Sequence, residues 1–142
     1  MKYWDSSALL PLIVREATSS AMQSLLGDDT DVLTWWGSRV EAHSALARLE
    51  RDGALPATSY EAAMNRLRLF AASWHEVAPT EVVREQAERL LRVHALRAAD
   101  AFQLAAAVVA SEHRPASLPV ITLDARLQQA AVREGFSVLP SG

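Results

Sequence analysis

Cysteine is absent from this chain of 142 residues. Its absence excludes disulfide bonds, thiolate nucleophiles and zinc sites built on cysteine. Lysine is nearly absent as well, because Lys2 is the only lysine among the 14 lysine and arginine residues. Phosphoryl-transfer enzymes and receiver domains also place aspartates after parallel strands, but they use a lysine late in the chain. The sequence therefore argues against both classes.

Motifs of other enzyme classes are missing too. There is no Gly-x-Ser-x-Gly elbow, which argues against serine hydrolysis, and no glycine-rich phosphate loop. The 4 histidines never occur at the His-x-x-x-His spacing of a histidine zinc site. The formal net charge is −3, so the overall charge does not by itself indicate a nucleic-acid partner.

Long hydrophobic runs are also missing. Residues 1–5 contain an acid where a signal peptide needs an apolar stretch. The longest run of small apolar residues, 98–110, contains Asp100 and Gln103 and is too short to span a bilayer. We therefore expect a cytoplasmic protein that makes no membrane contact.

The length and the hydrophobic pattern predict one α/β domain over residues 1–142. The predicted strands lie at 2–5, 32–36, 75–78, 119–123 and 136–139, and the predicted helices at about 17–26, 37–51, 56–70, 80–93, 98–111 and 124–134. Such an alternation favours a mainly parallel central sheet with helices on both faces. On these helices we expect Val40 and Leu91 to face the core.

Four carboxylates come at or just after predicted strand ends. Asp5 ends the first strand, and Asp124 follows the strand at 119–123. Glu41 and Asp100 lie in the first turns of two helices. Because ligands of parallel sheets bind beyond the carboxyl ends of the strands, we expect these side chains at one edge of the sheet. Carboxylates from separate elements are the hard oxygen ligands that hold Mg²⁺ or Mn²⁺.

Each acid also has a purely structural interpretation. Asp5 and Asp124 can cap the helices that follow them. Glu41 closes a Ser-x-x-Glu capping box, and Asp100 lies where a helix dipole favours an anion. Two details favour a shared site. Asp100 lies on an almost wholly apolar helix, where a carboxylate needs partners. Thr122 shares a strand face with Asp124 and can support a ligand carboxylate.

The four acids belong to four longer segments, at residues 3–9, 40–42, 96–107 and 122–127. Together these segments resemble the PIN-domain ribonucleases, and among them the VapC-type toxins of bacterial type II toxin–antitoxin systems. The most specific piece is Arg-Ala-Ala-Asp-Ala at 97–101 with Leu-Ala-Ala-Ala at 104–107. The departures are small: Trp4 replaces a more usual aliphatic or small residue. The resemblance spans the chain and implies a single PIN domain, a three-layer α/β/α sandwich with a short, mainly parallel sheet.

The resemblance implies a site and a reaction. Asp5, Glu41 and Asp100 match the three core metal-binding acids of the family, and Asp124 matches the fourth, more variable acid. The implied cofactor is Mg²⁺ or Mn²⁺. The implied reaction is endonucleolytic hydrolysis of RNA phosphodiester bonds, which leaves 5′-phosphate and 3′-hydroxyl ends.

Supporting residues and partners follow from the same resemblance. Ser6 or Ser7 stands where a hydroxyl often supports the site, and Thr122 matches the hydroxyl just before the fourth acid. Because the chain is acidic, contacts with RNA phosphates must come from local arginines, of which Arg97 is the best candidate. The family also implies a cognate antitoxin protein and a homodimer.

Two other functions stay open at this point. A PIN-like fold without catalysis could bind RNA or protein. The clustered acids argue against such a module, because two carboxylates about 4 Å apart repel by about 4 kcal/mol at an effective dielectric of about 20. A DNA nuclease is the second alternative, since the metal chemistry does not distinguish the two sugars.

Overall fold

One parallel sheet forms the centre of the computed structural model, which describes residues 1–141. Its strand order is β3-β2-β1-β4-β5, and every neighbouring pair is parallel. The strands are β1 (Lys2–Trp4), β2 (Val32–Trp35), β3 (His75–Val77), β4 (Val120–Ile121) and β5 (Val138–Leu139). The predicted mainly parallel sheet is thus confirmed, although β4 and β5 are shorter than their hydrophobic runs.

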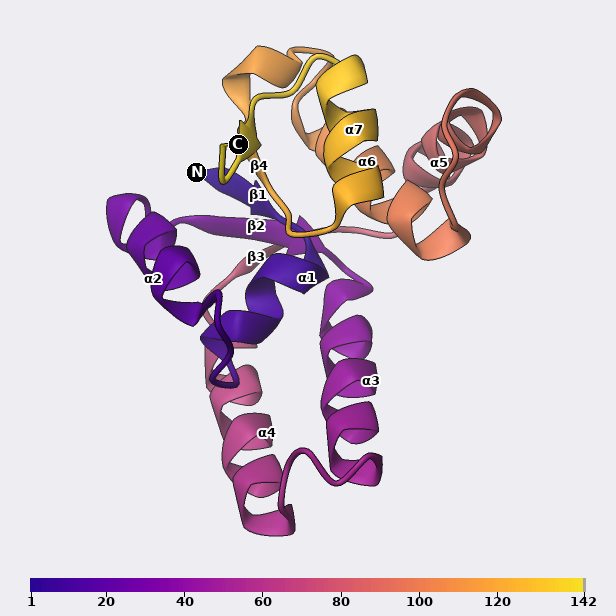
Figure 1. The fold of residues 1–142 in the computed structure, drawn as a ribbon. Helices are drawn as coiled ribbons and strands as arrows, with labels where there is room; N and C mark the ends of the chain where they lie inside the picture. The colour runs from indigo at the N-terminus through magenta and orange to yellow at the C-terminus, as the bar shows by residue number, and fades with distance from the viewer. Residues whose placement is uncertain (142) are drawn as a thin grey trace.

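Helices cover both faces of this sheet. They are α1 (Ser6–Leu9), α2 (Ser19–Asp28), α3 (Ser38–Arg51), α4 (Ala57–Ala71), α5 (Glu81–Val93), α6 (Ala98–Ala110) and α7 (Ala125–Arg133), with 3₁₀ turns at Leu10–Leu12 and Pro115–Ser117. In Figure 1, α1 to α4 lie below the sheet and α5 to α7 lie above it. The chain therefore has the expected three layers, α/β/α.

The strand side chains divide between two hydrophobic cores. Tyr3 and Val120 belong to the core under α5, α6 and α7. Trp4 and Ile121 belong to the core under α1 to α4. Successive residues of a strand point to opposite faces, so these short strands bury side chains on both sides.

Helix α6 is the most buried helix, as its alanine-rich sequence predicts. Seven of its residues are buried: Ala101, Gln103, Leu104, Ala105, Ala106, Ala107 and Val108. No single helix within residues 1–141 is long and apolar enough to cross a membrane, and only α5 and α6 taken together, bent by 119°, reach that length and composition.

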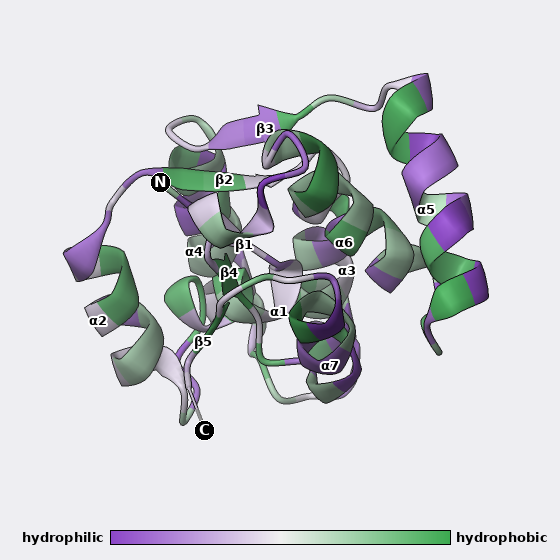
Figure 2. Ribbon diagram, turned by 90° about the horizontal axis from the view of Figure 1, so that it is seen from above, coloured by the Kyte–Doolittle hydropathy of each residue, from purple (hydrophilic) through white to green (hydrophobic). Residues whose placement is uncertain are grey.

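The edge strand β3 is polar. Its first two residues, His75 and Glu76, are exposed, and Figure 2 shows β3 in purple beside the green β2. Charged side chains on an edge strand discourage pairing with another sheet.

Two predicted core residues are exposed. Val40 on α3 is 68% exposed and Leu91 on α5 is 42% exposed, so both predictions are wrong. The buried face of α3 instead contains Ala42 and Leu46, and Val40 lies on the opposite side because two residues turn a helix by about 200°. Leu91 follows the buried Leu90 and is rotated about 100° from it.

The strand order reverses its direction between β1 and β4. Helix α1 leaves β1 toward one layer, and α7 leaves β4 toward the other. A crevice opens at such a point beyond the carboxyl ends of the strands, where open α/β sheets bind their ligands. Asp5 is the first residue after β1. Asp124 follows β4 after a short turn, so both acids lie at this edge of the sheet.

Candidate active site

Asp5 is the most firmly held of the four predicted acids. It is 4% exposed and follows β1 directly. Its Oδ2 accepts hydrogen bonds from the Ser7 backbone N–H and the Ser7 hydroxyl, and from the Thr122 hydroxyl at 2.8 Å. Its other oxygen, Oδ1, accepts no hydrogen bond from residues 1–141. One carboxylate oxygen is therefore fixed by the fold, and the other is left for a ligand.

Glu41 is held from two sides. The Ser6 hydroxyl donates to Oε1 at 2.9 Å, and the Gln103 amide donates to Oε2 at 3.1 Å. Gln103 is itself buried, and its carbonyl accepts from the Tyr3 hydroxyl at 2.6 Å. Its amide also donates to Ser38 Oγ at 2.9 Å. The Glu41 carboxylate is thus oriented by residues of β1, α1 and α6.

Asp100 and Asp124 line an open cavity of about 500 Å³. Asp100 lies in the first turn of α6, and Asp124 is the N-cap of α7, where Oδ1 accepts from the Leu127 N–H at 2.9 Å. The Asp124 N–H donates to the Thr122 hydroxyl at 3.1 Å. The Thr122 hydroxyl therefore contacts both acids: it donates to the Asp5 carboxylate and accepts from the Asp124 backbone N–H.

The electrostatics show that the four acids influence one another. Burial raises the pKa of Asp5, and the charge of Asp124 raises it further. Burial raises the pKa of Glu41, and the charges of Asp5 and Asp100 add to the effect. Burial also raises the pKa of Asp100, with the charge of Asp124 as the next cause. Asp5, Glu41 and Asp100 are thus each close enough to another acid for its charge to oppose their ionisation.

The donor set has the chemistry that a hard divalent cation requires. It offers only carboxylate and hydroxyl oxygens, and a cation would offset both the burial and the mutual repulsion that raise the three pKa values. The side chains as they stand do not converge, because no group of three or more His, Cys, Asp or Glu residues within residues 1–141 is arranged to hold a metal ion. Hydroxyl and amide donors engage Asp5, Glu41 and Asp124 instead. The residues fit the ion by type, and the metal stays a proposal.

The structural interpretations of the acids are partly correct. Asp5 and Asp124 do cap α1 and α7 with their side chains. The Ser-x-x-Glu capping box does not form, because Gly37 is the N-cap of α3. The Ser38 hydroxyl, which such a box would use, instead accepts from Thr34 Oγ1 at 2.7 Å. Capping accordingly accounts for one oxygen of Asp124 and for the hydrogen bond from the Ser7 backbone N–H to Asp5. It does not account for the hydrogen bond from Thr122 to Asp5 or for the contacts of Glu41.

Sequence reasoning missed the buried polar network behind Glu41. It consists of Tyr3, Gln103, Ser38 and Thr34. One signal was available: Gln103 is the other polar residue of the apolar helix α6 and lies three residues after Asp100, on the same side of that helix.

Two arginines border the acids. Arg97 and Arg126 line the same cavity as Asp100 and Asp124. Their positive charges lower the pKa of Asp100, against the larger effect of burial. A larger cavity, about 730 Å³, lies between the first 3₁₀ turn and α2 and contains none of the four acids.

Two known proteins are similar to this chain over almost its whole length. They are named Ribonuclease VapC45, from Mycobacterium tuberculosis strain CDC 1551 / Oshkosh, and Ribonuclease VapC49, from Mycobacterium tuberculosis strain ATCC 25618 / H37Rv. Each is 34% identical over 142 residues, which cover 98% of this chain and 94% of the relative. No family model matches the chain.

Proposed function

The chain belongs to the VapC-type family of PIN-domain ribonucleases, and from this premise we propose that it is a metal-dependent endoribonuclease. The single observation that carries the proposal is the placement of Asp5 and Asp124 after the neighbouring strands β1 and β4, where the strand order reverses. The charge of Asp124 adds to the effect of burial on the pKa of Asp5 and Asp100, and the charges of Asp5 and Asp100 do the same for Glu41.

The residues that would hold Mg²⁺ or Mn²⁺ are Asp5, Glu41, Asp100 and Asp124. The chemistry that such an ion supplies when bound is a lowered pKa of a water molecule and neutralisation of charge on the phosphate oxygens. No protein nucleophile is required, since water supplies the oxygen that becomes part of the 5′-phosphate. The bond from phosphorus to O3′ of the preceding ribose breaks, and that oxygen takes up a proton to become the 3′-hydroxyl.

The protein side chains prepare this site in different ways. Ser7 and Thr122 hold one oxygen of Asp5 in place, and Ser6 and Gln103 hold Glu41. A fixed carboxylate reorganises little when a cation and a phosphate arrive, which is the condition for efficient electrostatic catalysis. Asp100 and Asp124 face the open cavity, where an RNA phosphate has access.

The partners that we propose follow from the family. The protein would act as the toxin of a toxin–antitoxin pair, as a homodimer in the cytoplasm. The antitoxin would close the cavity of Asp100 and Asp124 with a basic side chain, because clustered acids attract a positive charge.

The test is cleavage of RNA by purified protein. Wild type and Asp100→Asn are incubated with total cellular RNA in Mn²⁺, and the new RNA ends are mapped. We expect discrete new 5′-phosphate ends with wild type, none with Asp100→Asn, and none with wild type in EDTA. Equal cleavage by the two proteins would overturn the assignment of the site.

Two further arms test the other functions of this fold. Labelled DNA of the same sequence is digested beside the RNA, and equal cleavage would replace the ribonuclease by a general nuclease. RNA binding without cleavage under every metal condition would replace it by a non-catalytic binding module.

A further inference from the structure

A second cavity, of about 580 Å³, adjoins the acid-lined one. The two share Arg97 and Arg126 among their lining residues. The second cavity contains no acid, and it adds Arg133, Gln129 and His94. A depression thus leads from Asp100 and Asp124 onto a surface that offers positive charge.

The basic residues of this cavity follow one face of α7. Arg126, Gln129 and Arg133 are spaced by three and four residues, so they lie on the same side of the helix. The first and last of them are about 10 Å apart along the helix axis. Asp124 caps the beginning of α7, so this row of side chains starts beside the acids and runs away from them.

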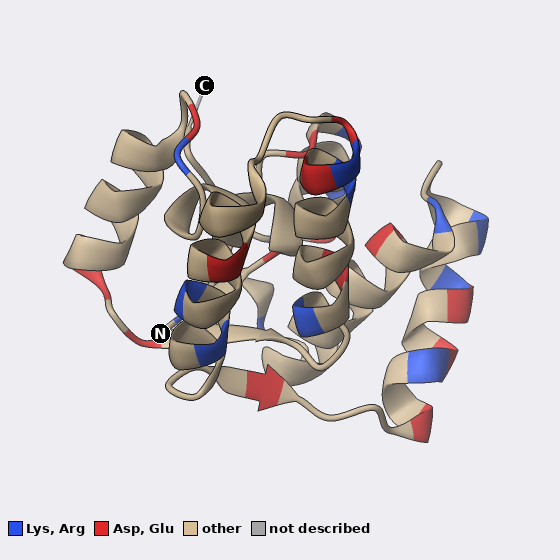
Figure 3. Cartoon of the chain, turned by 90° about the horizontal axis from the view of Figure 1, so that it is seen from below, with Lys and Arg blue, Asp and Glu red and all other residues tan. Residues whose placement is uncertain are grey.

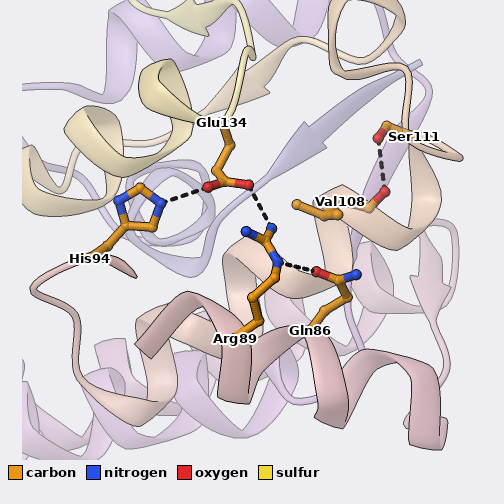
Figure 4. A network of polar contacts seen from close by, with 6 residues as sticks. All are labelled: Gln86, Arg89, His94, Val108, Ser111 and Glu134. Atoms are coloured by element: carbon orange, nitrogen blue, oxygen red, sulfur yellow. Dashed lines mark hydrogen bonds and ion pairs between the residues drawn. The ribbon is translucent and has the colours of Figure 1, made fainter. Parts of the chain in front are cut away.

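The arginines are available to a ligand. Arg97, Arg126 and Arg133 are exposed, and none of them forms an ion pair within residues 1–141. Glu134 is the obvious acid to neutralise its neighbour Arg133. Both of its oxygens are engaged elsewhere, one by Arg89 at 2.6 Å and the other by His94 at 2.7 Å, as Figure 4 shows.

His94 connects the two walls of the cavity. It is the C-cap of α5, and its side chain is 4% exposed. Its Nε2 contacts Glu134 at the end of α7, and its Nδ1 has no hydrogen-bond partner within residues 1–141. The segment that leads from α5 to Arg97 is thereby held against α7, and Arg97 and Arg126 line the same cavity.

The surface as a whole does not identify a binding face. Figure 3 shows acidic and basic residues mixed over the side seen from below, and they alternate along α5 at the right. A chain of net charge −3 can therefore bind a polyanion only where arginines gather without acids. Within the described residues the second cavity meets that condition.

We propose that the cavity lined by Arg97, Arg126 and Arg133 is a phosphate-binding subsite for the RNA strand beside the cleaved bond. A length of about 10 Å along α7 lets Arg126 and Arg133 contact two phosphates of one strand. The arginines contact backbone phosphates and not base edges, so the subsite positions the strand and does not select its sequence. The inference rests on the proposed ribonuclease function.

The test measures binding of a short fluorescein-labelled oligouridine by fluorescence anisotropy in EDTA, where no cleavage is expected. The association constant is followed over a range of NaCl concentrations for wild type and for the double variant Arg126→Gln/Arg133→Gln. Each phosphate contact contributes about 0.7 to the slope of log K against log[NaCl] for a single strand, so we expect the slope to fall by about 1.4.

Two control variants make the result specific. Arg48→Gln/Arg51→Gln removes the same charge at the far end of α3, about 10 to 15 Å from Glu41 along that helix, and is expected to keep the wild-type slope. Arg126→Lys/Arg133→Lys keeps the charge and is expected to restore most of the slope. Equal melting temperatures of all variants would exclude a loss of folding.

The subsite and the proposed function fail in different ways. An unchanged slope in the double variant, or no binding by wild type even at low salt, overturns the subsite. RNA cleavage that depends on Asp100 would still support the nuclease. A reduced slope in a protein that cleaves no RNA supports the subsite and overturns the nuclease.

Discussion

At the scale of single residues, the ionised carboxylate of Asp100 is unfavourable in the folded chain. Burial and the charge of Asp124 raise the pKa of its carboxyl. A raised pKa means that the folded chain binds the proton more tightly than the unfolded chain does. Ionisation of Asp100 at neutral pH therefore lowers the free energy of unfolding.

Asp100→Asn removes this charge and keeps the shape of the side chain. In EDTA at pH 7 we expect the melting temperature to rise by about 1–3 °C, a small shift because solvent screens a half-exposed group. The gain should shrink as the pH falls through the raised pKa, since wild type is then protonated. Scanning calorimetry at pH 7 and at a series of lower pH values checks this. A lower melting temperature at pH 7 would show that the helix dipole of α6 stabilises the charge more than Asp124 opposes it.

Thr122 is the hydroxyl on which two acids depend. It is fully buried, donates to Asp5 and accepts from the Asp124 N–H. Thr122→Val keeps the branched shape and removes both bonds. We expect the free energy of unfolding to fall by about 1–2 kcal/mol and RNA cleavage to fall about tenfold, because Asp5 loses one of its fixed donors.

The matched control for Thr122 is Ser111→Ala. The Ser111 hydroxyl is also buried, and it donates to the Val108 carbonyl at the opposite end of α6 from Asp100. This variant should lose a similar amount of stability, about 1 kcal/mol, and cleave RNA like wild type. A similar loss of cleavage in the two variants would mean that Thr122 acts through stability alone. Urea unfolding and initial cleavage rates separate the two effects.

At the scale of elements, Glu134 joins α5 to α7. Burial alone would raise the pKa of Glu134, but the hydrogen bonds from Arg89 and His94 outweigh it and lower the pKa. A lowered pKa stabilises the fold above the pKa of the unfolded chain. That stability is lost as the pH falls through the folded value.

Glu134→Gln tests this connection. At pH 7 we expect the free energy of unfolding to fall by about 1–3 kcal/mol, because the buried His94 loses a charged partner. As the pH falls through the lowered pKa of Glu134, the variant and wild type should become more alike, since Glu134 is then protonated in both states of wild type. Urea unfolding at pH 7 and over a descending series of pH values provides the measurement. Glu81→Gln removes a charge from the exposed pair with Arg84 on α5. Its free energy of unfolding should match that of wild type at every pH.

The elements also show what a sequence can and cannot predict. The alternation of strands and helices was readable because the hydrophobic period changes at each boundary. The face of a helix was harder to predict: Val40 lies on the solvent side, since only positions such as Ala42 and Leu46, four apart, set the buried face. The roles of Ser38 and Gln103 depend on contacts across more than 60 residues, and the spacing of Gln103 from Asp100 indicates its side of α6 but not these partners.

At the scale of the whole molecule, the site is a product of the strand order. Asp5 and Asp124 are 119 residues apart in sequence, and they meet because β1 pairs with β4. The sequence predicted acids at one edge of a parallel sheet and did not predict which strands are neighbours. The sequence therefore named the four acids and Arg97 as candidates, while the neighbouring strand ends of β1 and β4 and the cavity that Arg97 shares with Arg126 and Arg133 required the fold.

A cation that binds this assembled edge must stabilise the folded chain. Binding to the folded state alone adds about 2.7 kcal/mol to the free energy of unfolding at a metal concentration about 100 times Kd. We expect Mn²⁺ to raise the melting temperature of wild type progressively with its concentration. Asp5→Asn and Asp100→Asn should respond far less, because each removes a carboxylate of the proposed ligand set. Glu61→Gln, an exposed acid on α4, should respond like wild type. An equal response in Asp100→Asn would place the bound cation elsewhere on the acidic chain, and EDTA should return every protein to its metal-free melting temperature.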